Sequence, residues 1–344
     1  MSALISPVEQ RAGAAAASVC AAGRLHLGFL DPSGSLGRRF GSIGLAVDGF
    51  QTEVIIAPAA RDEWHADTPD GVAQLDRAAA CVQRLREQCG RAAPLALRLC
   101  SVLPPHAGLG SGTQLALAIG RAFVRWQGLD VATPTLAAWL GRGQRSGIGI
   151  AGFDVGGLLV DGGPGRGGLP APLLARLPLP ESWRIVVALD ERLQGLSGAR
   201  ESSAIAALPA FGQSQAAELC HQVLMRVLPG AASGEFAPFA AGINRVQELL
   251  GAHFAPAQGG SAWTSASVGR LLQWVRGHAG DQAAVGQSSW GPTGFAIVPS
   301  AAAAQHLLDA ARAAGVIDAA LVLRTVTARN RGASMGGGAP RTRG

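Results

Sequence analysis

Lysine and tyrosine are both absent from this 344-residue chain, so all 29 of its basic residues are arginine. The absence of lysine excludes a Walker-type phosphate loop and Schiff-base catalysis, because each needs a lysine amine. Arginine is suited instead to bidentate binding of carboxylates and phosphates. A biased genome composition explains the missing lysine as well as a functional preference for arginine does. The absence of lysine therefore excludes two chemistries but assigns no function.

Long hydrophobic runs are also missing. No stretch reaches about 18 uninterrupted apolar residues, which predicts no transmembrane helix. The alanine-rich run from Ala14 to Ala22 has little bulky apolar content and follows Glu9, so it does not have the pattern of a signal peptide. The five cysteines form no Cys-x-x-Cys pair, which favours reduced thiols. We therefore expect a cytoplasmic protein with no membrane partner.

The positive charge is not concentrated in one segment. The net charge of +6 is spread along the chain, and no basic run with interleaved aromatics precedes the C-terminal tail. Nucleic-acid binding is therefore unsupported, whereas a small anionic substrate needs only a local positive site. With 48% apolar residues, the chain has enough material for the cores of two domains.

Strand-like and helix-like patterns are mixed along the chain without strict alternation. The strand patterns cover residues 16–30, 43–57, 95–102, 155–162, 185–189 and 321–326. The helix patterns cover 71–89, 113–126, 133–140, 214–228, 235–251, 265–278 and 301–314. This order predicts an α+β fold with mixed or antiparallel sheets, not a doubly wound parallel sheet. We expect domains over 1–172 and 173–328, and a disordered Gly- and Arg-rich tail over 329–344.

A glycine-rich loop joins the strand at 95–102 to the helix at 113–126. Gly108, Gly110 and Gly112 remove side chains where backbone N–H groups must approach an anion, and Ser111 and Thr113 add hydroxyl donors. The unpaired N–H groups at the start of the helix and its positive dipole end point to the same place. Residues 108–113, including Leu109, are therefore the predicted phosphate or pyrophosphate site.

Several separated segments resemble one enzyme family. They are 24–31 (RLHLGFLD), 37–45 (GRRFGSIGL), 105–114 (PHAGLGSGTQ), 141–149 (GRGQRSGIG) and 286–293 (GQSSWGPT), with a weaker match at 242–247 (GINRVQ). Together they resemble the beta-ribofuranosylaminobenzene 5'-phosphate synthases of the GHMP kinase superfamily. The loop itself resembles the superfamily's phosphate loop, but those kinases typically have a second serine where Gly112 stands. That serine helps to hold magnesium, so its absence argues against ordinary kinase activity.

The resemblance implies a GHMP-kinase-like fold with the active site between two domains. It also implies an activity: phosphoribosyl pyrophosphate is joined to para-aminobenzoate or para-hydroxybenzoate with loss of carbon dioxide, in methanopterin-type cofactor biosynthesis. The family further suggests Mg²⁺, no organic cofactor and a homodimer. The sequence does not decide which aromatic acid is used or which residues hold the metal. An ATP-dependent small-molecule kinase and a non-catalytic sugar-phosphate sensor remain the alternatives.

The catalytic candidates are His26 and Asp154. His26 lies two residues from Arg24 on a predicted strand, so both side chains face the same side. It can serve as an acid/base group, bind phosphate or be structural. Asp154 resembles the catalytic aspartate of the kinase superfamily through the loose pattern Gly147-x₆-Asp154-x₂-Gly157.

The substrate-binding candidates are polar residues in the segments that carry the resemblance. Arginines are the expected partners of the substrate carboxylate and phosphates, because a guanidinium binds such anions with two hydrogen bonds. The candidates are Arg24, Arg38, Arg39, His106, Arg142, Arg145, Gln287, Ser288 and Ser289. Asp31 either caps a turn with Pro32 or binds metal. The usual phosphoribosyltransferase signature is absent, because no small-residue loop follows the acidic pair Asp190-Glu191.

Overall fold

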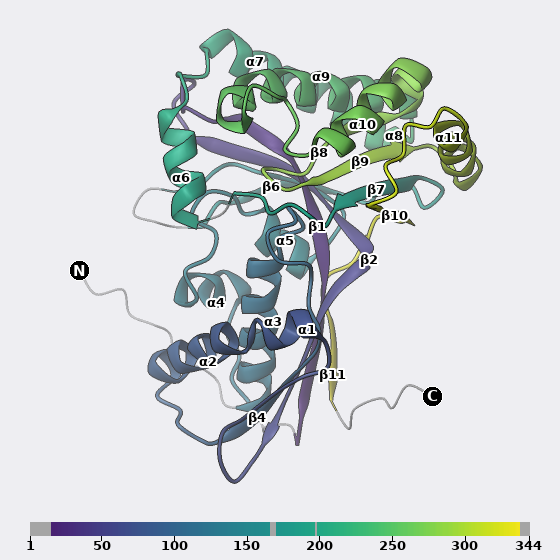
Figure 1. Ribbon diagram of the computed structural model, residues 1–344. Coiled ribbons are helices and arrows are strands. Elements are labelled where there is room, and N and C mark those ends of the chain that lie inside the picture. Colours follow the sequence, from purple (N-terminus) through teal and green to yellow (C-terminus); the bar gives the residue numbers. More distant parts are fainter. Residues whose placement is uncertain (1–14, 166–169, 197, 338–344) are drawn as a thin grey trace.

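The computed structural model describes residues 15–165, 170–196 and 198–337, which form two lobes that are each built on one β-sheet (Figure 1). A long hairpin of β1 (Ala17–Asp31) and β2 (Phe40–Pro58) extends from the lower lobe of that view into the upper lobe. In the part of the chain described, none of the helices has the length and apolar character needed to cross a membrane.

The larger sheet has the order β11-β1-β2-β4-β3, and β5 and β6 extend it from the upper part of β2. The added strands are β3 (Glu63–Ala66), β4 (Leu95–Ser101), β5 (Leu158–Asp161), β6 (Leu173–Leu177) and β11 (Ser334–Gly337). β3 runs parallel to β4, and the other pairings described are antiparallel. The mixed sheet confirms the predicted α+β class.

Helices cover one face of the larger sheet in the lower lobe (Figure 1). They are α1 (Pro69–Val72), α2 (Leu75–Cys89), α3 (Ser111–Trp126), α4 (Thr133–Trp139) and α5 (Ile148–Asp154). The apolar stripe of α3, with Leu115, Ile119 and Phe123 fully or almost fully buried, packs against Val82 and Leu85 of α2. This 3.6-residue spacing explains why the pattern at 113–126 predicts a helix.

The smaller sheet of the upper lobe is antiparallel and has the order β10-β7-β9-β8. Its strands are β7 (Arg184–Asp190), β8 (Ala284–Gln287), β9 (Thr293–Val298) and β10 (Leu321–Val326). One face packs under α10 (Ala266–Ala279) and α11 (Ala301–Ala313). The other shares a core with the upper end of the β1–β2 hairpin, α7 (Gln213–Gln222) and α9 (Phe236–Phe254). The upper lobe also has the α-helices α6 (Gly198–Ala207) and α8 (Leu228–Ser233), a π-helix over Val223–Val227, and 3-10 helices over Ala255–Gln258 and Gly280–Gln282.

The C-terminal region differs from the sequence-based expectation. Residues 329–337 are not a disordered tail, because β11 pairs with the start of β1 and Arg329 is buried. Residues 338–344 lie outside the described part of the chain. The division at residue 172 also differs, since β6 begins at Leu173 and still belongs to the larger sheet.

The burial of Arg329 leads to a stability prediction. Its guanidinium donates to Asp48 Oδ1 at 3.1 Å, Ser334 Oγ at 2.9 Å and the Gly332 carbonyl at 3.0 Å. We expect Arg329→Ala to lower the free energy of unfolding by about 2 kcal/mol, because it removes the packing of a buried side chain and its hydrogen bonds to three acceptors. Urea unfolding checks this, with the exposed Arg331→Ala as control. Equal stability of the two variants would show that the segment contributes little to the fold.

Candidate functional site

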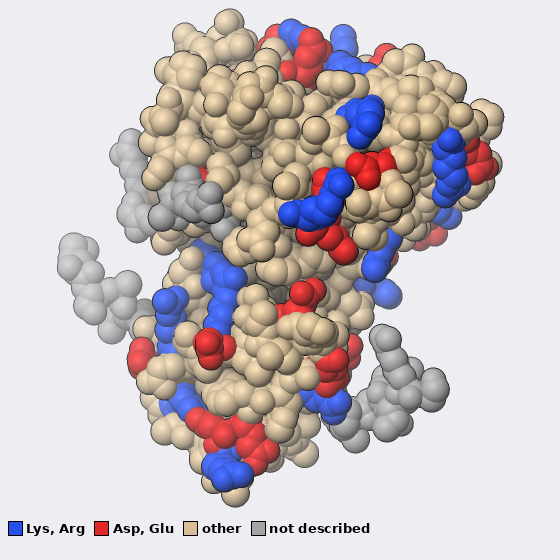
Figure 2. All heavy atoms as spheres, in the orientation of Figure 1, with Lys and Arg blue, Asp and Glu red and all other residues tan. Residues whose placement is uncertain are grey.

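A cleft of about 700 Å³ lies where the two lobes meet. Figure 2 shows arginine side chains gathered between the lobes on this face of the molecule. The cleft is formed by the glycine-rich loop, β1, the 141–146 segment, the start of α6 and the β8–β9 turn. The residues that line it are Arg24, His26, Phe29, Arg77, His106, Gly108, Gly110, Ser111, Gly112, Thr113, Gly141, Arg142, Gly143, Gln144, Arg145, Ser146, Leu196, Gly198, Glu201, Ser289, Trp290 and Gly291.

Two carbonyl groups of the glycine-rich loop accept hydrogen bonds from neighbouring segments. Arg24 Nη1 and Ser288 Oγ both donate to the Gly108 carbonyl, each at 2.7 Å. The backbone N–H of Arg24 donates to the Leu109 carbonyl at 3.0 Å. These contacts hold the loop in one conformation and pair the oxygens that would otherwise repel an anion.

The loop amides are left available. Gly110 adopts a left-handed φ of 80° and is the N-cap of α3, which gives the chain its sharp turn into the helix. Among the described residues, no acceptor is assigned to the backbone N–H groups of Ser111 and Gly112. Both residues line the cleft, so these N–H groups, at the start of a 16-residue helix, lie beside the open cleft. The predicted anion site therefore has the required geometry.

Arg24 is half-buried beside this loop. Its Nε has no hydrogen-bond partner among the described residues, and its guanidinium lies against Gly110, where an added Cβ would be 3.3 Å away. Burial lowers the pKa of Arg24 to about 10, which leaves it charged at neutral pH. Arg24 therefore brings a fixed positive charge and a free donor to the phosphate loop.

Arg77 was not among the candidates from the sequence, yet it occupies the space beside Gly112. A Cβ on Gly112 would lie 2.8 Å from Arg77 Nη2, so the missing side chain makes room for a guanidinium. Arg142 lies nearby, and its pKa is lowered by burial and by Arg77. Gly112 stands where the related kinases typically carry a serine, and it thus leaves room for a second cation, the guanidinium of Arg77.

Arg145 faces the cleft from the segment before α5 and forms a 2.6 Å ion pair with Glu201 of α6. Asp161 holds this segment in place, because its carboxylate accepts from the N–H of Gly147 at 2.8 Å and from Ser146 Oγ at 3.1 Å. Glu201 and Asp161 were not candidates from the sequence, because only the folded chain brings each of them to its partner.

His26 is buried at the inner end of the cleft, with 4% of its surface exposed. Its Nε2 has no partner among the described residues. Burial lowers the pKa of His26 to about 3, and the charges of Arg24 and Arg145 act in the same direction. The imidazole is therefore neutral at physiological pH and can exchange hydrogen bonds with a ligand.

A β-bulge in β1 adds an aromatic ring to this face. The register of the hairpin shifts between His26 and Gly28, so Phe29 joins Arg24 and His26 on the cleft side instead of pointing away. The Phe29 ring meets the His26 ring edge-on with centroids 4.7 Å apart. Simple alternation along the strand predicts the first two side chains but not this third one.

The β8–β9 turn brings the three polar candidates of that segment to the site in different ways. Ser288 is buried, and its Oγ accepts from the N–H of His26 at 2.9 Å while donating to Gly108, so it links β1 to the loop. Ser289 has a positive φ of 54°, which is uncommon for a residue other than glycine, and lines the cleft. Gln287 does not line the cleft but lines a second pocket.

His106, from the glycine-rich segment, also lines the cleft, and it has a positive φ of 57°.

Other candidates lie outside the cleft. Asp154 is exposed at the end of α5, where its carboxylate accepts from Thr133 Oγ1. Arg38 and Arg39 are exposed and donate to backbone carbonyls of Gly163 and Pro32. The structure therefore gives these three side chains no place in the cleft.

Two further aspartates considered from the sequence have structural partners. Asp31 caps the turn that follows β1, because its carboxylate accepts from the N–H groups of Gly34 and Leu36. Asp190 forms a 2.8 Å ion pair with Arg192 and also accepts from Ser265. Neither residue lines the cleft.

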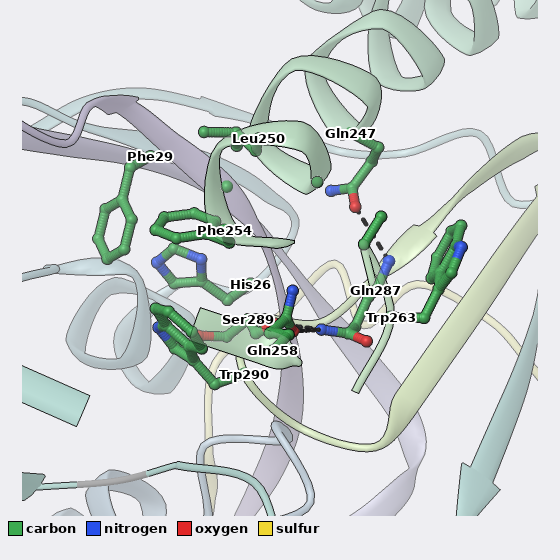
Figure 3. Close-up of a pocket in the computed structure, with 13 residues that line it drawn as sticks. His26, Phe29, Gln247, Leu250, Phe254, Gln258, Trp263, Gln287, Ser289 and Trp290 are labelled. Carbon is green, nitrogen blue, oxygen red and sulfur yellow. Dashed lines mark hydrogen bonds between the residues drawn. The ribbon is translucent and has the colours of Figure 1, made fainter. Parts of the chain in front are cut away.

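A smaller, more apolar pocket of about 50 Å³ adjoins the cleft (Figure 3). His26, Phe29, Ser289 and Trp290 line both spaces. The remaining lining residues of this second pocket are Gly28, Gln247, Leu250, Gly251, Phe254, Gln258, Ala262, Trp263 and Gln287. An arginine-rich cleft thus opens beside an aromatic-lined pocket, which suits a phosphorylated substrate and a ring-shaped one.

The cleft offers few metal ligands. Within the described residues, no group of three or more His, Cys, Asp or Glu side chains is arranged to hold a metal ion. Glu201, the one carboxylate among the described residues that line the cleft, is paired with Arg145. The side chains present do not fit a resident magnesium ion, which prefers carboxylate and water oxygens.

Comparison with known proteins agrees with this geometry. Residues 76–158 match the family described as GHMP kinases N terminal domain. The chain is 33% identical over 289 residues to the beta-ribofuranosylphenol 5'-phosphate synthase of Archaeoglobus fulgidus, covering 80% of this chain and 86% of that protein. It is also 29% identical over 242 residues to the protein of the same name from Methanothermobacter thermautotrophicus, covering 65% and 73%.

The chain belongs to the beta-ribofuranosylphenol 5'-phosphate synthase family. Membership confirms the predicted resemblance and makes the chain a member of a pentosyltransferase family. Solved structures show the same fold at low identity. Streptococcus pneumoniae phosphomevalonate kinase has a TM-score of 0.66 at 14% identity, covering 91% of this chain and 99% of that one. Cytophaga hutchinsonii homoserine kinase has a TM-score of 0.64 at 16% identity, covering 96% and 100%. The predicted GHMP-kinase-like fold is confirmed.

Proposed function

We propose that this chain catalyses decarboxylating phosphoribosyl transfer from phosphoribosyl pyrophosphate to para-hydroxybenzoate, with para-aminobenzoate as the alternative acceptor. A bond forms between the ring carbon that bears the carboxylate and the anomeric carbon of the sugar. The bond from that anomeric carbon to pyrophosphate breaks, and its electron pair leaves with the pyrophosphate. The bond to the carboxyl group then breaks, its electron pair restores the aromatic ring, and carbon dioxide leaves.

The observation that carries the proposal is the set of amides at the start of α3 that have no acceptor among the described residues, in a cleft also lined by Arg24, Arg77 and Arg142. Negative charge builds on the pyrophosphate as it leaves, and donors fixed in advance stabilise that charge without reorganising. The phenol in the relatives' name is the product expected from para-hydroxybenzoate, because loss of its carboxylate during ribosylation leaves a para-substituted phenol.

Magnesium enters this proposal as part of the substrate. Since the described residues of the cleft include no carboxylate cluster, we propose that Mg²⁺ arrives bound to the pyrophosphate group and that arginines contact the remaining phosphate oxygens. No organic cofactor is needed by the reaction as written. The five free cysteines support the proposal that the enzyme works in a reducing compartment such as the cytoplasm.

The test uses para-hydroxybenzoate or para-aminobenzoate labelled in its carboxyl carbon. Purified protein is expected to release labelled carbon dioxide and pyrophosphate in equal amounts, only when phosphoribosyl pyrophosphate is present. Absence of release with both acids would reject the proposal. ATP-dependent phosphorylation of a small alcohol would favour a kinase instead, and tight sugar-phosphate binding without turnover would favour a sensor.

The neutral state of His26 predicts a characteristic pH dependence. In the unfolded chain its pKa returns to the usual 6.5, whereas in the folded chain it is about 3. As the pH falls from 6.5 towards 3, the unfolded state gains a proton that the folded state does not, so stability is lost across that window. Urea unfolding of the wild type and His26→Gln at pH 7.5 and 5 should show the wild type losing more stability than the variant.

The same argument predicts that the pH profile of kcat/KM between pH 5 and 8 contains no ionisation from His26. We expect His26→Gln to lower activity, because the imidazole that lines the cleft is lost, but to leave the shape of the profile unchanged. An ionisation near pH 6.5 that disappears in His26→Gln contradicts the neutral assignment.

A further inference from the structure

We propose that the pocket beside the cleft is the subsite for the aromatic acid, which it holds with the para substituent innermost and the carboxylate at the junction with the cleft. The inference rests on the proposed function for the orientation of the ring. The four residues that line both spaces form this junction: His26, Phe29, Ser289 and Trp290.

The chemistry of the reaction sets the orientation. The ring carbon that bears the carboxylate must reach the anomeric carbon of the sugar, and the sugar is held by its phosphates in the arginine-rich cleft. That carbon therefore lies at the junction, and the para position, on the opposite side of the ring, points into the pocket. At about 50 Å³ the pocket holds only a few water-sized groups, so it takes the far part of the ring and leaves the carboxylate end outside.

The pocket walls suit a benzene ring. Phe254 and Trp290 meet at a tilt with their ring centroids 4.8 Å apart, and Leu250 and Phe29 add apolar surface. In Figure 3 the rings of Phe29, Phe254 and Trp290 lie around the His26 imidazole, with Gln247, Gln287 and Trp263 on the other side. Edge-to-face contacts with such rings favour an aromatic ligand over an aliphatic one of similar size.

Fixed amide groups form the polar end of the pocket. Gln287 Nε2 donates to Gln258 Oε1 at 2.9 Å and to the Ser289 carbonyl at 2.8 Å, while its Oε1 accepts from the N–H of Thr264 at 2.7 Å. Gln247 Oε1 accepts from the N–H of Gln287 at 2.9 Å. Each amide oxygen can accept two hydrogen bonds, and the described residues give one donor to Gln287 Oε1 and one to Gln247 Oε1, which leaves one acceptor position on each.

These acceptor positions match a para hydroxyl or amino group. Donation from that group to a neutral amide oxygen increases the electron density of the ring, which makes the ring carbon a better nucleophile. A para hydrogen or methyl group can fill the same space but donates nothing. The amides therefore select acids whose para substituent is both a hydrogen-bond donor and electron-donating.

His26 fits the carboxylate end. Its Nε2 is buried and has no hydrogen-bond partner among the described residues, and the residue lines both spaces. A neutral imidazole orients a carboxylate without a full opposing charge, so it does not stabilise the ionised carboxylate against loss of carbon dioxide as a guanidinium would. His26 is thus the group that contacts the carboxylate, and the arginines are left to the phosphates.

Calorimetric titration tests the subsite without turnover. 4-Hydroxybenzoate, 4-methylbenzoate and benzoate are titrated into the full chain, alone and with inorganic pyrophosphate. We expect 4-hydroxybenzoate to bind about 10-fold more tightly than the other two, the effect of one hydrogen bond. Ala262→Leu, which fills the pocket, should weaken 4-hydroxybenzoate binding by about 10-fold or more without changing pyrophosphate binding. Ala252→Leu, on the exposed side of α9, is the control.

The outcomes separate the subsite from the function. Equal affinity for the three acids, unchanged binding in Ala262→Leu, or no binding of any acid would overturn the subsite even if the enzyme turns over. Binding with the expected order but no product when phosphoribosyl pyrophosphate is added supports the subsite and rejects the proposed transfer reaction.

Discussion

Gly112→Val is expected to lower kcat/KM for phosphoribosyl transfer by about 10³-fold, the scale of losing a preorganised donor to the leaving group. Gly112 is the second residue of α3, and its N–H has no acceptor among the described residues. A valine side chain covers the anion path and displaces Arg77, whose Nη2 lies 2.8 Å from the Cβ position. The pyrophosphate then loses its contacts with both the amides and the neighbouring cation.

The fold should survive this change. Gly112 does not have a positive φ, and the atom that a Cβ would meet is the far end of a flexible side chain. We expect the midpoint of thermal unfolding to move by no more than about 3 °C. Gly277→Val is the matched control, because Gly277 lies in α10 with nothing within 4 Å of its Cβ position. Normal turnover in Gly112→Val would remove the loop from the mechanism.

Gly110→Val is a less direct probe of the same loop. Gly110 has a φ of 80°, which a valine adopts only under strain of about 1–3 kcal/mol. The loss of activity in that variant would therefore combine a blocked anion site with a distorted start of α3. Thermal unfolding of Gly110→Val should show the strain, whereas that of Gly112→Val should not.

Arg24→Ala is the second large effect, with an expected loss of about 10²–10³-fold in kcat/KM. The change removes the 2.7 Å hydrogen bond to the Gly108 carbonyl and a positive charge beside the pyrophosphate. It also leaves that carbonyl partly unpaired next to an anion. Steady-state kinetics with phosphoribosyl pyrophosphate as the varied substrate measure the loss, and calorimetry should show weaker binding of inorganic pyrophosphate.

Two comparisons make the Arg24 result specific. Arg24→Lys keeps the charge but loses the planar group that reaches Gly108 while facing the cleft, so it should recover activity only in part. Arg312→Ala removes an exposed arginine of α11, far from the loop in sequence, and should behave as the wild type. Unchanged kinetics in Arg24→Ala would show that Arg24 has only a structural role.

Local residue patterns specify the parts of the site that lie within one segment. The alternation at 95–102, the glycines at 108, 110 and 112, and the helical stripe that follows specify a strand, loop and helix start through neighbouring residues alone. Arg24 and His26 share a face because residues two apart on a strand do so. These features need only short-range geometry, so a pattern of residues is enough to predict them.

Which distant residues join the site depends on how the segments pack together. Arg77, Glu201 and Trp290 enter the cleft from α2, α6 and the β8–β9 turn, while Asp154 is left on the outer side of α5. The bulge that turns Phe29 inward depends on how β1 pairs with β2. Such placements follow from packing between segments far apart in the chain, which local spacing does not encode.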